Sequence, residues 1–345
     1  MKKTFYILNT FFIPTPYNHR FFVEKFAKGF GYSGFEVKVV SDVSEITDPG
    51  FVMVSFHNLF YNNIWLIRLL RADFTRFFNG YKLIPGAKSG ESLLPYAGGV
   101  LGAIAEKFQL SVIRKLRGKD IIVIAWFSYP LEETFKKMGL RYILSGDYYY
   151  TKPAIQANRR WYEIFNANRL ALPVRFAADI NPEEIGLNCY NDKWEVCYIG
   201  NGTYHPEWYS LFKKNEKARI VPTPPYIPEE ERVSIYKNAM VSLGLHDIKN
   251  SDNGNVTERV FESLALGAVC VTDNPSAEAA TQNCAVYFKD KEDLLKKVDF
   301  FLKNTEERKK VRERGFRFIK EHGTYASRAE EFIALAKEQY GAEFE

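Results

Sequence analysis

The segment from Asn250 to Ser276 (NSDNGNVTERVFESLALGAVCVTDNPS) combines polar residues with a predicted helix in a pattern that suits an anion. Thr257 precedes the first helical turn and can cap it. The free amide groups and the dipole of a helix start attract phosphate, and here they belong to Val256, Thr257 and Glu258. Arg259 adds a fork of donors that matches a diphosphate. The segment therefore predicts a diphosphate site.

Two further polar side chains flank this helix start. Asn255 stands directly before it, and Glu262 lies one turn later, where it could accept hydrogen bonds from ribose hydroxyls. A plainer alternative is an amphipathic helix that packs its apolar face on a sheet and leaves its charged residues in solvent. The apolar residues of that face are Val260, Phe261, Leu264 and Ala265.

Three other loops supply candidates for the same ligand. Gly200-Asn201-Gly202 and Tyr204 follow the predicted strand Trp194–Ile199, and glycines let backbone amides approach a phosphate or sugar closely. Thr223 begins the stretch TPPYI, which could clasp a base, and His246 follows the run VSLGL. The alternatives at these places are an ordinary turn, a rigid proline loop and a structural histidine.

The first half of the chain offers two groups that could move a proton. His19 ends the loop FFIPTPYNH after the first predicted strand, and Asp147 follows the run RYILSG. Either side chain can serve as a general base when it is suitably placed. No Asp-x-Asp cluster stands where a metal would bridge a diphosphate. We therefore expect Arg259 and the helix amides to neutralise the ligand without a metal ion or a covalently bound cofactor.

Short strand-like runs alternate with helical patterns, which is typical of parallel sheets joined by crossover helices. In the first half the predicted strands are Thr4–Asn9, Phe35–Val40, Phe51–Phe56, Ile121–Ala125 and Arg141–Leu144. In the second half they are Trp194–Ile199, Ala218–Val221, Ala239–Leu245, Ala268–Thr272 and Ala285–Phe288. Pro173 is predicted to end a helical segment between the two series. Ligands of such sheets bind outside the carboxyl ends of the strands, where the candidates lie.

The length of 345 residues exceeds the roughly 250 to 300 at which a single core stops growing, so it favours two domains. We predict an α/β fold of two Rossmann-like, doubly wound domains that face each other across a cleft. The predicted boundaries give an N-terminal domain at 1–178 and a C-terminal, ligand-binding domain at 179–322. Residues 323–345 are predicted to form a helix that packs back toward the N-terminal domain.

A basic helical insertion is predicted at about 61–119. Between Leu66 and Lys119 the acids are Asp73, Glu91 and Glu106, whereas the bases are Arg68, Arg71, Arg76, Lys82, Lys88, Lys107, Arg114, Lys115, Arg117 and Lys119. Aromatic residues are interleaved with these bases. Such a stretch can be a solvated helical face, or it can hold an anionic molecule, a membrane surface or nucleic acid.

The composition is that of a folded globular protein, with 46% hydrophobic and 26% charged residues. The four cysteines form no C-x-x-C pair, so we interpret them as reduced core thiols. The first ten residues predict a strand and not a signal peptide, and no apolar run is long enough to cross a membrane. We expect a cytoplasmic protein. A second alternative is a cytoplasmic protein that contacts the inner face of a membrane through residues 66–119.

The segment from Asn250 to Ser276 resembles the donor site of the spore-maturation-type (CgeB-like) glycosyltransferases and of the wider family 4 enzymes with the two-domain GT-B fold. The matching parts are Asn255, Arg259, Phe261-Glu262, Ala265, Gly267 and Thr272-Asp273. A second match is the closing signature made of His322, Thr324, Tyr325, Arg328 and Ala329. The resemblance implies an enzyme that takes a UDP- or GDP-sugar as donor. It extends from about Asp192 to Phe332.

The sequence departs from family 4 at Gly254, where those enzymes carry the first of two Glu separated by seven residues. The stretch Lys249–Glu258 is also similar to a motif of α1,3-fucosyltransferases, with Arg259 in place of Lys. The first resemblance implies retention at the anomeric centre, and the second implies inversion with GDP-fucose. Only an inverting reaction needs a general base such as Asp147 or His19.

The leading hypothesis is transfer of a sugar to a hydroxyl acceptor on a surface glycan or a lipid-linked glycan. The alternatives are a fucosyltransferase-like inverting enzyme, an enzyme that glycosylates a DNA base, and a non-catalytic nucleotide- or glycan-binding module. An epimerase or a phosphorylase on the same scaffold is a further possibility, although we identify no lysine site for the cofactor of a phosphorylase.

Overall fold

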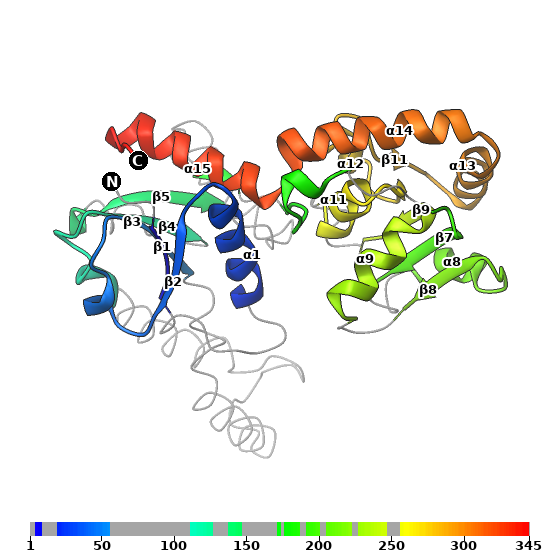
Figure 1. Ribbon diagram of the computed structural model, residues 1–345. Helices are drawn as coiled ribbons and strands as arrows, with labels where there is room; N and C mark the ends of the chain where they lie inside the picture. Colours follow the sequence, from blue (N-terminus) through cyan, green and yellow to red (C-terminus); the bar gives the residue numbers. More distant parts are fainter. Residues whose placement is uncertain are drawn as a thin grey trace, which may run out of the picture.

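The computed structural model consists of two parallel β-sheets, each covered by helices (Figure 1). The structure describes residues 4–8, 19–55, 111–126, 137–146, 171–173, 176–186, 191–200, 205–222, 227–246 and 256–344. Over these residues the chain is an α/β protein, as the sequence predicts. No helix among them is both long enough and apolar enough to cross a lipid bilayer.

The first sheet has the strand order β2-β1-β3-β4-β5-β6, and all of its strands run parallel. The strands are β1 (Thr4–Leu8), β2 (Glu36–Val40), β3 (Gly50–Ser55), β4 (Ile121–Trp126), β5 (Arg141–Gly146) and β6 (Ala171–Pro173). Every residue of β1 is buried, because a central parallel strand is covered on both faces. The prediction of a helix that ends at Pro173 is wrong at its end. Ala171–Pro173 instead form the strand β6, which pairs with β5.

The second sheet has the order β11-β10-β9-β7-β8 and is also parallel. Its strands are β7 (Trp194–Ile199), β8 (Ala218–Val221), β9 (Ala239–Gly244), β10 (Val269–Thr272) and β11 (Val286–Tyr287). Among the described residues of this half, the helices are α8 (Pro206–Tyr209), α9 (Glu229–Lys237), α11 (Glu258–Ala265), α12 (Ser276–Ala280), α13 (Lys291–Lys303) and α14 (Thr305–Phe318). The order reverses between β7 and β9, and such a switch point is where doubly wound sheets bind ligands.

The C-terminal helix belongs to the core of the first sheet although it follows the second sheet in the chain. This helix, α15 (Tyr325–Tyr340), lies beside α1 (His19–Tyr32) and is drawn in red in Figure 1. The ring of Phe332 meets the ring of Phe26 edge-on, with centroids 5.2 Å apart. The burial of these aromatic rings fixes α15 on the first sheet.

The chain passes twice between the two halves, and the two crossings are hydrogen-bonded to each other. The Ala178 N–H donates to the Gly323 carbonyl at 2.7 Å, and the Tyr325 N–H donates to the Ala178 carbonyl at 3.2 Å. Thr324 then caps α15 by accepting from the Ser327 amide. We propose that the domain boundaries, predicted at 178/179 and 322/323, fall at these paired crossings.

Helices α1 and α15 approach so closely that one position of α1 has no room for a side chain. A Cβ atom on Gly29 would lie 2.2 Å from the Tyr325 carbonyl oxygen, which is backbone and cannot swing away. A Cβ atom on Gly31, in the same helix, would have its nearest contact at 3.9 Å. Gly29 is therefore required by packing, whereas Gly31 is not.

We expect Gly29→Ala to lower the free energy of unfolding by about 3 kcal/mol, because α1 and α15 must separate to admit the methyl group. Gly31→Ala, the matched control, should be neutral or raise it by up to about 1 kcal/mol, since alanine is the better helix former. Urea denaturation of both variants measures the difference. Equal stability of the two variants would contradict the close approach at Gly29.

Candidate functional site

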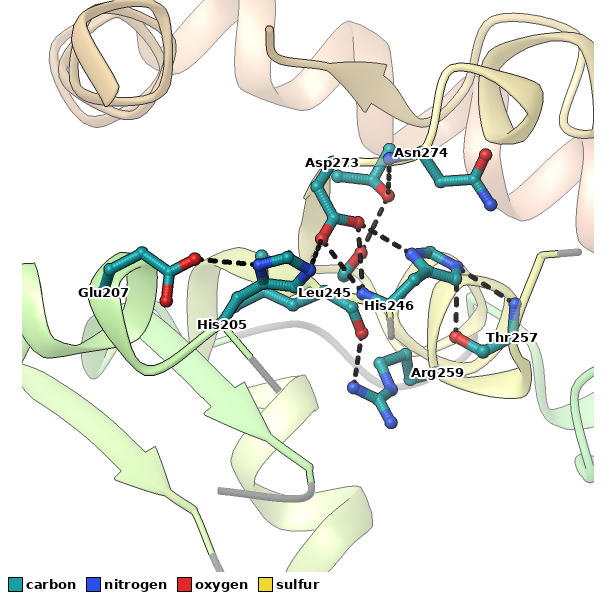
Figure 2. Close-up of polar contacts among 10 residues, drawn as sticks. His205, Glu207, Leu245, His246, Thr257, Arg259, Asp273 and Asn274 are labelled. Carbon is teal, nitrogen blue, oxygen red and sulfur yellow. Dashed lines mark hydrogen bonds and ion pairs between the residues drawn. The ribbon is translucent and has the colours of Figure 1, made fainter. Parts of the chain in front are cut away.

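The carboxyl ends of three neighbouring strands meet at one edge of the second sheet. β7 leads to Gly200, β9 leads to Leu245 and His246, and β10 leads to Asp273. The start of α11 lies beside these ends (Figure 2). This edge coincides with the switch point between β7 and β9, so the strand order and the candidate residues indicate the same place.

His246 is completely buried and joins two loops that follow different strands. Its backbone N–H donates to both carboxylate oxygens of Asp273 at 3.1 Å, and its Nδ1 lies 2.9 Å from Asp273 Oδ1. On the other side of the ring, the Thr257 N–H donates to Nε2 at 3.1 Å. Because an amide can only donate, Nε2 is the acceptor, and the Nδ1 proton points to Asp273. His246 thus sets the position of the α11 start.

Thr257 occupies the N-cap position of α11 in an extended conformation, but its side chain makes no capping hydrogen bond. The hydroxyl lies 3.2 Å from His246 Nε2 instead, so the cap expected from the sequence is wrong. A side-chain cap would compete with a ligand for the amides of the first turn. The side chain of Thr257 therefore leaves the N–H groups of the first turn of α11 uncapped. The N–H of Thr257 itself, which the sequence predicts to bind phosphate, is taken by His246 Nε2.

Arg259 extends from the first turn of α11 across the ends of β9 and β7. Its Nη1 donates to the Leu245 carbonyl at 2.6 Å. A Cβ atom on Gly200 would lie 2.7 Å from this nitrogen and 2.7 Å from the Tyr198 hydroxyl. Burial raises the pKa of Tyr198, and the nearby Arg259 guanidinium opposes that rise. Gly200 is thus the residue type that leaves space for a guanidinium at this edge.

The two glutamates of α11 are already paired with cations. Lys25 of α1 donates to Glu258 Oε1 at 2.6 Å, and the Tyr325 hydroxyl donates to the same oxygen at 3.1 Å. Glu262 is 4% exposed and accepts a hydrogen bond from Arg232 of α9. The alternative from the sequence, in which the charged residues of this helix lie in solvent, is therefore wrong for Glu258 and Glu262. The predicted ribose contact of Glu262 stays a prediction.

His205 also lies at this edge of the sheet, beside Asp273, although the candidates from the sequence do not include it. It has a left-handed backbone conformation, with φ of 46°, directly after the loop that follows β7. Its Nδ1 lies 2.8 Å from Glu207 Oε1, and its Nε2 lies 3.6 Å from Asp273 Oδ2 (Figure 2). Burial raises the pKa of Glu207, but the hydrogen bond with His205, a backbone hydrogen bond and the charge of His205 together outweigh burial and leave this pKa lowered. The sequence feature that could have indicated this residue is its position at the end of a glycine-containing loop.

The structure brings together seven of the predicted ligand-binding residues, which are Gly200, His246, Val256, Thr257, Glu258, Arg259 and Glu262. Six candidates lie outside the described residues: Asp147, Asn201, Gly202, Tyr204, Thr223 and Asn255. α1 begins at His19. Of the predicted basic insertion only 111–119 is described, and there Arg114, Lys115 and Arg117 are exposed.

Within the described ranges, no group of three or more His, Cys, Asp or Glu side chains is arranged to hold a metal ion. Cys197, Cys270 and Cys284 are buried and free. Burial raises the pKa of Cys197 and that of Cys270 to about 12, so these thiols are protonated at neutral pH.

Residues 188–334 match a family model described as glycosyl transferase-like. This part of the chain contains the second sheet, α11 and most of α15, so the candidate site lies in the part that matches this family model. No curated protein sequence matches the chain.

Several solved structures are similar to the chain over almost its whole length. A glycosyltransferase from Rickettsia africae has a TM-score of 0.51 at 10% identity, and covers 98% of each chain. An α-glucosyltransferase in complex with UDP has a TM-score of 0.52 at 10% identity, covering 97% of this chain and 99% of the other. The trehalose-6-phosphate phosphatase N-terminal domain of Candida albicans has a TM-score of 0.54 at 9% identity, covering 98% of this chain and 97% of the other. At such low identity the likeness concerns the fold, which is GT-B.

We expect His246→Leu to lower the free energy of unfolding by about 2–4 kcal/mol, because the Asp273 carboxylate and the Thr257 amide both lose a buried partner. His322→Leu is the control, since that ring is 54% exposed and lies on the surface beside Glu321. Chemical denaturation compares the two variants. A His246→Leu protein as stable as the His322→Leu protein would contradict a structural role for His246.

Proposed function

We propose that this protein is a glycosyltransferase that moves a sugar from a UDP- or GDP-sugar to a hydroxyl acceptor. The observation that carries the proposal is the position of Arg259, which lies in the first turn of α11 at the switch point of a glycosyltransferase-like domain. The amides of this turn and the guanidinium suit a nucleoside diphosphate. Gly200 provides room for that guanidinium.

In this proposal the diphosphate is the leaving group of the reaction. Its negative charge grows as the bond to the sugar breaks, so donors that are already in place stabilise the transition state more than the ground state. Arg259 is held by the Leu245 carbonyl, and the start of α11 is held by His246. Little reorganisation is then needed when the charge develops.

The finer assignments are part of the same proposal. Asn201, Gly202, Tyr204, Thr223 and Asn255 complete the donor site, and Glu262 contacts the ribose through an oxygen that Arg232 leaves available. His19 contacts the sugar, and Asp147 acts as general base if the reaction inverts the anomeric centre. The acceptor is a surface glycan or a lipid-linked glycan held by the basic segment 66–119.

Thermal-shift measurements with UDP, GDP, CMP, ADP and their sugars test the class of donor, and release of free sugar from the stabilising donor tests turnover. We expect one uridine or guanosine diphosphate sugar to stabilise the protein and to be hydrolysed slowly. UDP is tried first, because a structure of the same fold was solved with UDP. Binding without any turnover would favour a non-catalytic module, and a preference for GDP-fucose would favour the fucosyltransferase-like alternative.

We expect Arg259→Met to weaken diphosphate binding about 100-fold and Arg259→Lys about tenfold, since lysine keeps the charge but loses the fork of donors. Arg219→Met is the control, because Arg219 is an exposed residue of β8 paired with Glu231. Calorimetric titration with the best nucleotide measures the affinities. An unchanged affinity in Arg259→Met would remove the central residue of the proposal.

We expect turnover to persist in excess EDTA, because Arg259 and the helix amides take the role of a bridging metal. The assay follows product formation before and after chelation and after addition of Mn²⁺. Loss of turnover with EDTA and its rescue by Mn²⁺ would show that a metal ion takes part.

A further inference from the structure

The proposed diphosphate site has an electrostatic difficulty, because two carboxylates lie on the helix that would hold the anion. Glu258 is the first residue of α11, and Glu262 follows one turn later. Both have little exposure, with side chains that are 22% and 5% accessible. Buried like charges repel a diphosphate more strongly than solvated ones, since water screens them less.

Two cations offset these carboxylates, and they come from different halves of the molecule. Arg232 of α9, in the half that contains α11, pairs with Glu262. Lys25 of α1, from the first sheet, has its Nζ 2.6 Å from Glu258 Oε1 and 3.9 Å from Glu262 Oε1. The two acids and the two bases carry no net formal charge as a group. Arg259 then adds a positive charge at the helix start.

Lys25 is held in place by the packing of α1. Its side chain is only 4% exposed, so it has no solvated alternative without movement of the helix. One turn further on, Gly29 contacts the backbone of Tyr325, whose hydroxyl also donates to Glu258. The charge that Lys25 brings to α11 therefore depends on the docking of α1 against α11 and α15.

We propose that Lys25 is a positioning residue for the donor site, which neutralises Glu258 and Glu262 so that the start of α11 can accept a diphosphate. This inference rests on the proposed function. Lys25 acts through the charge of the glutamates and does not touch the ligand. Donor affinity is thereby linked to the packing of the first half of the chain against the second.

The effect should grow with the charge of the ligand. One unit charge several ångströms from a diphosphate changes its affinity on the order of tenfold at a protein–water boundary. A nucleoside monophosphate carries less charge and should respond less, and an uncharged nucleoside should not respond. A loss of packing would instead weaken all three ligands alike.

The experiment is calorimetric titration of Lys25→Met with UDP, UMP and uridine, or with GDP, GMP and guanosine if the wild-type protein prefers guanine. We expect about tenfold weaker binding of the diphosphate and an unchanged affinity for the nucleoside. Lys25→Arg should bind within about threefold of the wild type, because it keeps the charge. Lys38→Met, which removes one positive charge on β2, should bind as the wild type does.

A second pair of variants keeps the inference testable if Lys25→Met does not fold. Glu258→Gln should bind the diphosphate several-fold more tightly than the wild type, because one repelling charge is gone. The double variant Lys25→Met/Glu258→Gln should return to about the wild-type affinity, since both charges of the pair are removed together.

Three results would overturn the inference while leaving the proposed function intact. They are equal weakening of diphosphate and nucleoside in Lys25→Met, an unchanged diphosphate affinity in Lys25→Met, and a Glu258→Gln protein that binds the diphosphate less tightly than the wild type. A wild-type protein that binds no nucleoside diphosphate would overturn the proposed function together with the inference.

Discussion

The hydrogen bonds of His246 are the constraint on which the site depends. A buried imidazole with one donor and one acceptor nitrogen can satisfy two different partners, and here these are the Asp273 carboxylate and the Thr257 amide. His246 after β9, Asp273 after β10 and the start of α11 are therefore fixed relative to one another. Because α11 begins at a defined place, Arg259 reaches the Leu245 carbonyl at the carboxyl edge of the sheet.

The second constraint is the return of the chain to its first half. α15 packs on α1, and the two crossings pair through Ala178. This return brings Tyr325 and Lys25 to the same carboxylate of Glu258. The first half of the molecule is thus part of the electrostatic environment of α11, and the two sheets are joined by buried charge as well as by chain connections.

The pattern of strands was largely predictable, because buried parallel strands appear as short apolar runs and their helices as periodic ones. β6 was missed because it has only three residues and ends in proline, which pattern analysis assigns to the end of a helix. The Thr257 cap was also wrong, since a competing acceptor, His246 Nε2, comes from a loop eleven residues away in the sequence.

The sequence by itself determined the parallel α/β architecture and the helix start that carries Arg259, because both follow from neighbouring residues and short periods. It could not determine the partners of Glu258 and Glu262. Lys25 is separated from Glu258 by 233 residues, and nothing in the local pattern of either segment indicates the other. Only the packing of α1 and α15 decided this contact, because a buried charge is tolerated where the fold supplies its counter-charge.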